Sequence, residues 1–271
     1  MNTFAVNDHQ MAYRDIGQGP VIVFGHSYLW DSQMWAPQID VLCQHYRCIV
    51  PDFWAHGESD FAPPSMTSLV DYAQHILALM DHLGVESFSV LGLSVGGMWG
   101  SEIVTLAPER VVSLVMMDTF VGLEPEVTHQ KYFAMLETIS AAQMVPVPIV
   151  EAVVSLFFAH QTMQELPDLV NGFRQRLNHL KGEQAAEVAR MGRMVFGRRD
   201  QIEDIEKFDL PVLIAVGEQD IPRPVFESFL MHDCIKGSQL VQIPQAGHIS
   251  SLEQPAFVTT MLDDFFAQVH A

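Results

Sequence analysis

The chain has 271 residues, of which 49% are hydrophobic and 17% are charged, and 33 acidic against 14 basic side chains give a formal net charge of -19. This composition supplies enough apolar material for a large core and excludes the disordered and fibrous classes. A negative field repels phosphate backbones and anionic lipid surfaces, so we expect no nucleic acid among the partners.

The N-terminal stretch from Asn2 to Gln10 is polar and lacks the basic and apolar segments of a secretory signal. No window reaches the roughly 20 apolar residues of a membrane helix, because Pro146, Pro148 and Glu151 interrupt the most apolar stretch. We therefore expect a cytoplasmic protein without a membrane span, present as a monomer or a homodimer.

Short apolar runs bounded by turn residues predict the strands of a sheet. Most runs are continuous rather than alternating, as expected for a parallel sheet that is covered on both faces. Helical spacing between them, such as that from Leu69 to Leu83 before a capping Gly84, predicts an α/β fold with a doubly wound, mostly parallel sheet. The predicted strands are Val21–Phe24, Cys48–Val50, Phe88–Leu91, Val111–Met117, Val212–Val216 and Leu240–Ile243.

The segment from about Val121 to Arg199 has no clear strand and is Met-rich and helical in pattern. We predict a core of residues 1–120 and 200–271 and an inserted helical cap of residues 121–199 over the sheet edge where ligands bind. Most of the methionines and phenylalanines of this cap should pack in its interior, and a minority should line an apolar acyl or alcohol pocket. They are Met135, Met144, Phe157, Phe158, Met163, Met191, Met194 and Phe196.

A G-x-S-x-G sequence runs from Gly92 to Gly96, directly after a predicted strand and before a predicted helix at Gly97–Ala107. In this strand-turn-helix context the sequence predicts that Ser94 is a nucleophile on a tight, strained turn. Flanking glycines avoid collisions at such a turn, and a helix N-terminus directs N–H groups toward developing negative charge. The alternative, a phosphate-binding turn, would need G-x-G-x-x-G or a nearby lysine, and neither is present.

A serine hydroxyl needs a base to take its proton. Among 12 histidines, His248 lies in a loop after the last predicted strand, where loops line the same crevice as the nucleophile; the alternative is a surface loop histidine. Asp220 follows the preceding strand and gives the chain order Ser, Asp, His, so we predict that it orients the histidine. Glu218 and Asp118 are the rival carboxylates.

Two backbone N–H groups should hold the oxyanion. Val95 follows the nucleophile, and Tyr28 lies in the loop after the first predicted strand, with Ser27 as the alternative. The side chains of Trp30 and Trp54, together with Ser27 and Tyr28, are candidates for the walls of a substrate pocket, although aromatic residues more often serve only in packing. No metal motif such as H-E-x-x-H is present, and we expect neither a metal nor a cofactor.

These motifs resemble the α/β-hydrolase superfamily, in particular its branch of small cytoplasmic carboxylesterases, enol-lactonases and C-C hydrolases. The resemblance covers nearly the whole chain, and Pro51–Ser59 is similar to the family's P-D-x-x-G-x-G-x-S loop. It implies that Asp220 and His248 are the acid and the base. The sequence departs from the family pattern at Ser27 and Ala55, where the family has glycine.

The predicted activity is hydrolysis of small carboxylic esters in two steps through an acyl-enzyme on Ser94. The same triad is compatible with hydrolysis of a lactone or thioester, cleavage of a C-C bond, or peracid formation. A ligand receptor built on the hydrolase fold is a further alternative. A dehalogenase is disfavoured, because that reaction needs a carboxylate at the position of Ser94.

Overall fold

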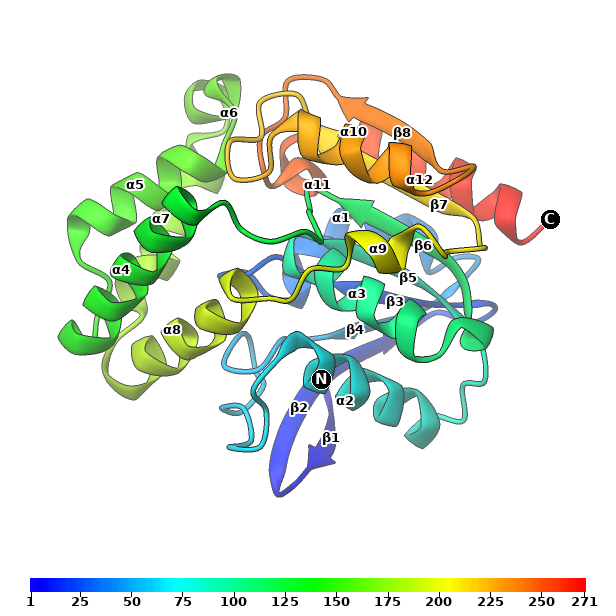
Figure 1. The fold of residues 1–271 in the computed structure, drawn as a ribbon, viewed down its shortest axis with the longest axis horizontal. Coiled ribbons are helices and arrows are strands. Elements are labelled where there is room, and N and C mark those ends of the chain that lie inside the picture. The colour runs from blue at the N-terminus through cyan, green and yellow to red at the C-terminus, as the bar shows by residue number, and fades with distance from the viewer.

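An eight-stranded sheet runs through the centre of the computed structural model, which describes residues 1–271 (Figure 1). The strand order is β1-β2-β4-β3-β5-β6-β7-β8; β3 to β8 are parallel, whereas β1 and β2 are antiparallel to their neighbours. The strands are β1 (Asn2–Val6), β2 (His9–Ile16), β3 (Val21–Gly25), β4 (Arg47–Pro51), β5 (Phe88–Leu93), β6 (Val111–Met117), β7 (Val212–Gly217) and β8 (Gln239–Ile243). The six predicted strands are confirmed to within a residue or two at each end.

Helices cover both faces of the sheet and divide the core into two clusters. Successive residues of a central strand alternate between them: Val90 belongs to the cluster that includes residues of α2, α3 and α10, and Leu91 belongs to the cluster that includes residues of α1 and α12. The doubly wound fold is therefore confirmed. These helices are α1 (Ala36–Leu42), α2 (Leu69–His82), α3 (Val95–Leu106), α9 (Ile202–Ile205), α10 (Val225–Cys234), α11 (Ser250–Glu253) and α12 (Pro255–Val269), with short 3-10 turns at Ser32–Trp35 and Pro108–Arg110.

The N-terminal hairpin of β1 and β2 is absent from the prediction, which treated Asn2 to Gln10 as a polar stretch. The two strands pair antiparallel at the edge of the sheet, and most side chains of β1 face solvent. An exposed edge strand needs no apolar run, so its sequence carries little signal. The turn consists of Asn7 and Asp8, both with positive φ, as expected for a two-residue hairpin turn.

Strand β3 lies between β4 and β5, so the direction in which the chain builds the sheet reverses at β3. In sheets of this type ligands bind outside the carboxyl ends of the strands at such a reversal. The loops that carry Tyr28, Ser94, Asp220 and His248 all follow carboxyl ends of parallel strands. The topology thus gathers the candidate residues at one edge of the sheet.

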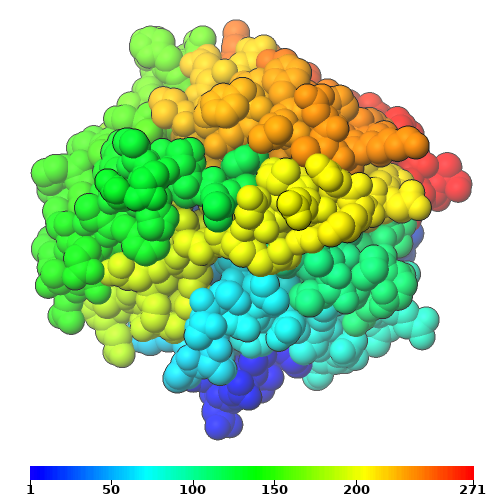
Figure 2. Space-filling view, viewed as in Figure 1, coloured from blue at the N-terminus to red at the C-terminus, as the bar shows by residue number.

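Six helices connect β6 to β7 without any intervening strand, and the first five of them form one side of the molecule, at the left of Figures 1 and 2. They are α4 (Glu126–Ala142), α5 (Val147–Phe157), α6 (His160–Glu165), α7 (Pro167–His179) and α8 (Gly182–Phe196) and are called the inserted helices below. The helical character predicted for this segment is confirmed, while its division from the core as residues 121–199 stays a prediction. None of the chain's helices combines the length and apolarity that crossing a bilayer requires.

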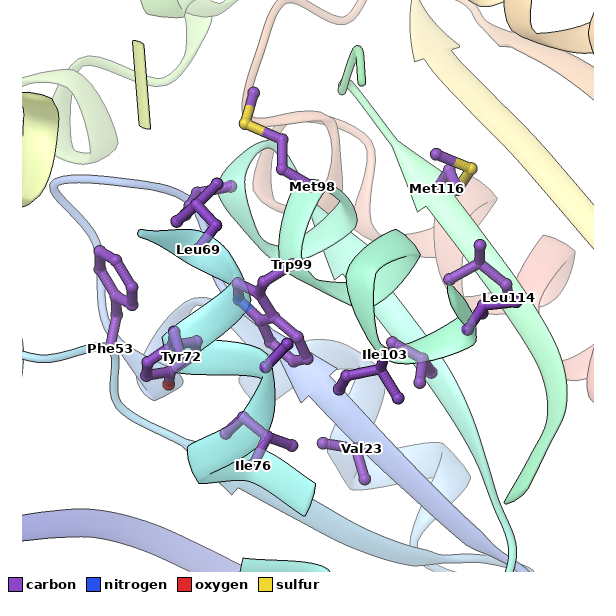
Figure 3. Close-up of a cluster of buried hydrophobic side chains, with 14 of the residues drawn as sticks. Val23, Phe53, Leu69, Tyr72, Ile76, Met98, Trp99, Ile103, Leu114 and Met116 are labelled. Carbon is purple, nitrogen blue, oxygen red and sulfur yellow. The ribbon is translucent and has the colours of Figure 1, made fainter. Parts of the chain in front are cut away.

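The core on the α2 and α3 face gives a first test of the fold. Figure 3 shows Leu114 of β6 within this cluster, and its side chain is fully buried. Replacing Leu114 with Ala should lower the free energy of unfolding by about 2–5 kcal/mol, because the lost methyl groups leave a cavity. The same replacement at Leu106, which is 41% exposed, should change it by less than about 0.5 kcal/mol. Urea unfolding of both variants measures the contrast, and equal losses would contradict this core.

Candidate active site

Ser94 occupies the sharp turn where β5 ends and α3 begins. Its φ of 57° lies in the left-handed region, which is strained for a residue with a side chain. A Cβ on Gly92 would lie 2.1 Å from the carbonyl carbon of Gly96, and a Cβ on Gly96 would lie 2.2 Å from the carbonyl oxygen of Gly25. The predicted need for glycine on both sides of Ser94 is confirmed.

His248 lies between Ser94 and Asp220, and all three side chains are buried. Its Nε2 is 3.0 Å from Oγ of Ser94, and its Nδ1 is 2.9 Å from Oδ2 of Asp220. A carboxylate at Nδ1 holds the proton on that nitrogen and leaves Nε2 free to accept the proton of the serine hydroxyl. The arrangement is therefore competent for proton transfer from Ser94 to His248.

The two rival carboxylates do not contact His248. Glu218 is exposed and accepts a hydrogen bond from the backbone N–H of Gln245. Asp118 is fully buried, where it accepts hydrogen bonds from the backbone N–H of Gly217 and from the hydroxyl of Ser250. Burial raises the pKa of Asp118, with a further contribution from the nearby negative charge of Asp220. Asp118 thus connects the ends of β6 and β7 beneath the triad.

Glu253 holds the loop that carries His248, a role that no motif indicated. Its Oε1 accepts hydrogen bonds from the backbone N–H groups of Gly247 and Ile249, at 3.0 and 3.1 Å. Its Oε2 accepts from the N–H of Ala159 and the hydroxyl of Thr162, at 2.8 and 2.6 Å. One buried carboxylate therefore connects the histidine loop to the start of α6.

The loop after β3 presents a free backbone donor. The N–H of Tyr28 donates to no other group of the protein, whereas its hydroxyl donates to the carbonyl of Val188 at 2.8 Å. Val95 is the first residue of α3, so its N–H has no acceptor within the helix. His26 fixes the loop, since its Nδ1 lies 2.8 Å from the carbonyl oxygen of Ser27 and its Nε2 accepts from Phe53 N–H.

The two departures from the family pattern, Ser27 and Ala55, differ in the backbone strain that they cause. Ser27 has no positive φ, so its side chain is accommodated without backbone strain, and its hydroxyl lies 3.3 Å from the carbonyl oxygen of Tyr28. Ala55 has a φ of 62°, a conformation that favours glycine. The strain of the second departure thus falls in the Pro51–Ser59 loop. Beside Tyr28 the strained residue is Leu29, whose φ of 71° lies in the region that favours glycine.

An almost wholly apolar cavity of about 80 Å³ adjoins Ser94 and His248. Most of its wall comes from the inserted helices, with contributions from Tyr28 and Met98 of the core. Of the methionines and phenylalanines singled out in the sequence, Met135, Phe157 and Phe196 line it, which agrees with the predicted minority. The cavity is suited to a short group because its volume is small, and to an uncharged group because its apolar wall has few partners for a charge.

The predicted wall residues need correction, since Ser27, Trp30 and Trp54 do not line this cavity. Ser27 is buried within the loop after β3, and Trp54 is buried in the core, where its indole N–H donates to Nδ1 of His75 at 3.2 Å. Trp30 stacks on Phe173 and lines a separate groove. The sequence gives the position of each residue in its loop but not the direction of its side chain.

A buried cluster of charges lies beside Asp220. Glu124 accepts hydrogen bonds from Arg198, at 2.9 Å, and from Arg223, and Glu227 Oε2 is 3.6 Å from Arg223 Nη1. The backbone N–H of Arg223 donates to Oδ1 of Asp220 at 2.9 Å. Because Glu124 precedes α4 and Arg198 follows α8, this ion cluster connects both ends of the inserted helices to the loop of Asp220.

Comparisons with known proteins agree with this architecture. Residues 20–255 match a family described as alpha/beta hydrolase fold. The 3-oxoadipate enol-lactonase 2 of Acinetobacter baylyi is 24% identical over 256 residues, which cover 94% of this chain and 92% of that protein.

Two solved structures are also similar over nearly their whole length. A thermophilic esterase from Thermogutta terrifontis has 26% sequence identity and a TM-score of 0.89, with 99% of this chain and 97% of that chain covered. The enol-lactonase from Burkholderia xenovorans LB400 has 24% identity and a TM-score of 0.87, with 98% and 100% covered. The second similarity concerns the fold alone.

The ion cluster predicts a pH-dependent stability. Burial raises the pKa of Glu227 to about 7, so between its ordinary pKa and this value the folded chain binds more protons than the unfolded chain. The wild type therefore loses about 3 kcal/mol of stability as the pH rises through this range, whereas Gln at position 227 does not titrate. Urea unfolding measures the free energy of unfolding of both proteins. The value for Glu227→Gln, relative to that of the wild type, should increase by about 3 kcal/mol between pH 5 and pH 8. A difference independent of pH would contradict the raised pKa.

Proposed function

The chain belongs to the α/β-hydrolase fold family, and from that premise we propose that it hydrolyses small carboxylic esters, with Ser94 as nucleophile, His248 as general base and Asp220 as the orienting acid. The observation that carries the proposal is the continuous pair of hydrogen-bond contacts from Ser94 Oγ through the imidazole to Asp220, at 3.0 and 2.9 Å. Nucleophile, base and orienting group within such distances are the requirement for acyl transfer.

In the first step Ser94 Oγ attacks the ester carbonyl carbon while its proton passes to Nε2 of His248. Asp220 stabilises the imidazolium that forms. The carbonyl oxygen becomes an oxyanion, which accepts hydrogen bonds from the N–H groups of Tyr28 and Val95. Collapse of the tetrahedral intermediate transfers the proton from His248 to the leaving alcohol and leaves an acyl group on Ser94.

In the second step a water molecule attacks the acyl carbon, and His248 again takes the proton at Nε2. The second tetrahedral intermediate expels Ser94, which recovers its proton from the imidazolium. Carboxylate product and free enzyme result. The apolar cavity beside Ser94 supports an acyl group that is short and uncharged.

We further propose that residues 121–199 act as a cap that specifies the acyl group, over a core of residues 1–120 and 200–271. Most of the cavity wall belongs to the inserted helices, which supports this division. In such an arrangement the core supplies the chemistry and the cap supplies the shape of the pocket.

Lactone hydrolysis is a second candidate, favoured by the enol-lactonases among the similar proteins. The enol-lactone of a dicarboxylic acid such as 3-oxoadipate keeps one free carboxylate. The cavity has one arginine, Arg223, and its guanidinium is already paired with Glu124. This pairing supports an uncharged lactone rather than an acidic one as the second class of substrate.

The first test of the proposal is the loss of turnover in Ser94→Ala. The wild type should hydrolyse p-nitrophenyl acetate and butyrate with sustained turnover and the longer esters more slowly, because the cavity is small. The variant should lose at least about a thousandfold in kcat, since no other group supplies the nucleophile. Steady-state kinetics measures both, and circular dichroism checks that the variant is folded.

Labelling with a fluorophosphonate separates the alternatives. Labelling of Ser94 without ester turnover would point to a lactonase, a C-C hydrolase or a ligand receptor on the same fold. Substantial hydrolysis by Ser94→Ala would overturn the assignment of the nucleophile.

The orienting role of Asp220 has a matched control in Glu218. Asp220→Asn should lower kcat by about 10⁴, because an amide stabilises the wrong imidazole tautomer. Glu218→Gln should leave kcat within about twofold, since that side chain is exposed and does not contact His248. Ester hydrolysis by the two variants at one pH makes the comparison. If the two variants lost similar activity, the choice between the two carboxylates would be wrong.

A further inference from the structure

Gly192 is a buried glycine in the interior of α8. Glycine is disfavoured there relative to alanine, because it loses more backbone freedom on folding. A Cβ at this position would lie 2.6 Å from Oη of Tyr28 and 2.6 Å from Cδ2 of Leu136. Non-bonded heavy atoms are best placed about 3.5–4.0 Å apart. The missing side chain of Gly192 is therefore what allows Tyr28 and Leu136 to occupy their present positions.

The hydroxyl of Tyr28 uses this space to reach the backbone of α8. It donates to the carbonyl oxygen of Val188 at 2.8 Å, and the tyrosine is 5% exposed. In an α-helix the same carbonyl accepts from the N–H four residues later, which here is that of Gly192. The hydroxyl thus meets the helix backbone beside the one residue that has no side chain to obstruct it.

Tyr28 and Leu136 both line the apolar cavity beside Ser94, whereas Gly192 does not. Protein interiors are close-packed, so a displaced side chain moves toward the nearest free volume. For both of these side chains that volume is the cavity. A methyl group at position 192 would therefore act on the cavity indirectly, by moving two residues of its wall inward.

Helix α8 is itself held to the loop between β4 and α2. Gln184 Nε2 donates to the carbonyl of Ala55 at 2.6 Å, and Arg190 Nη2 donates to the carbonyl of Ala62 at 2.8 Å. Moving the helix away from a new side chain would break these bonds as well as that of Tyr28. Displacement of the two neighbouring side chains is therefore the easier response to a larger residue at position 192.

We propose that Gly192 is a positioning residue that determines the acyl group of the substrate. By lacking a side chain it keeps Tyr28 and Leu136 out of the cavity and leaves room for an acyl chain longer than acetyl. The inference rests on the proposed ester hydrolysis and deepens it, since it assigns the acyl specificity to a residue outside the cavity wall. A larger residue at this position shortens the acyl group that the site accepts.

The test compares p-nitrophenyl butyrate with p-nitrophenyl acetate in the wild type and in Gly192→Ala. The two esters differ by two methylene groups and use the same nucleophile, base and oxyanion donors, so the ratio of their kcat/KM values reports the fit of the acyl group. This ratio of butyrate to acetate should fall about tenfold in Gly192→Ala, mainly through a higher KM for the butyrate, because room for one methylene is worth about 10- to 200-fold. Circular dichroism checks that the variant is folded.

Gly172→Ala is the matched control. Gly172 is also a glycine within an inserted helix, α7, but a Cβ there would meet no atom within 4 Å. Its replacement should leave the ratio unchanged. An equal fall in the two variants, or an unchanged ratio in Gly192→Ala, would overturn the proposal.

Tyr28→Phe supplies a rescue that a merely structural effect of Gly192→Ala would not show. It keeps the ring and the backbone N–H and removes the oxygen with which the new methyl group collides. In the Gly192→Ala background it should raise the ratio about threefold, and in the wild type by less, because nothing collides with the hydroxyl there. Additive effects of the two changes would mean that the methyl group acts elsewhere, against the proposal.

Calorimetric titration of Ser94→Ala with the two esters separates this inference from the proposed activity. Adding Gly192→Ala should weaken binding of the butyrate about tenfold relative to that of the acetate. This result supports the role of Gly192 even if the wild type hydrolyses neither ester. An equal change in the binding of both esters overturns that role even if both are hydrolysed.

Discussion

The close approach of three backbone segments around Ser94 is the constraint on which the site depends. Helix α3 begins so near the end of β3 that a side chain on Gly96 would overlap the carbonyl of Gly25, and Gly92 faces the same crowding from α3. This contact brings the loop after β3 beside the nucleophile. The positions of Tyr28 and Val95 relative to Ser94 thus depend on this glycine packing, together with the hydrogen bonds through which His26 holds the loop of Tyr28.

The site is held by buried carboxylates, each with its own compensating donors. Asp118 accepts two hydrogen bonds, Glu253 accepts four, and Glu124 lies between two arginines. Buried charge is costly without such partners, and losing one partner costs more than the pair contributes. All three of these buried carboxylates therefore have hydrogen-bond donors, and of the three only Glu124 is paired with cations.

The sequence was sufficient to predict the strands of the sheet and the residues that directly follow them. Ser94, Asp220 and His248 follow strands in a parallel sheet, and topology brings the carboxyl ends of such strands together. The roles of Glu253 and Glu124 were not predicted because they belong to no motif and depend on partners distant in sequence. Two of the four donors to Glu253 lie 94 and 91 positions before it, and the arginines that pair with Glu124 lie 74 and 99 positions after it. Trp54 was misplaced because the direction of a loop side chain depends on tertiary packing.

The four hydrogen bonds of Glu253 join the loop of His248 to the first turn of α6. The backbone N–H of His248 itself donates to the carbonyl of Phe157, which adds a fifth connection. Any widening of the cavity that moved this end of the inserted helices would break several buried hydrogen bonds at once and displace the imidazole from Ser94. The loop of His248 therefore anchors this end of the inserted helices, and any widening of the cavity has to come from other parts of these helices.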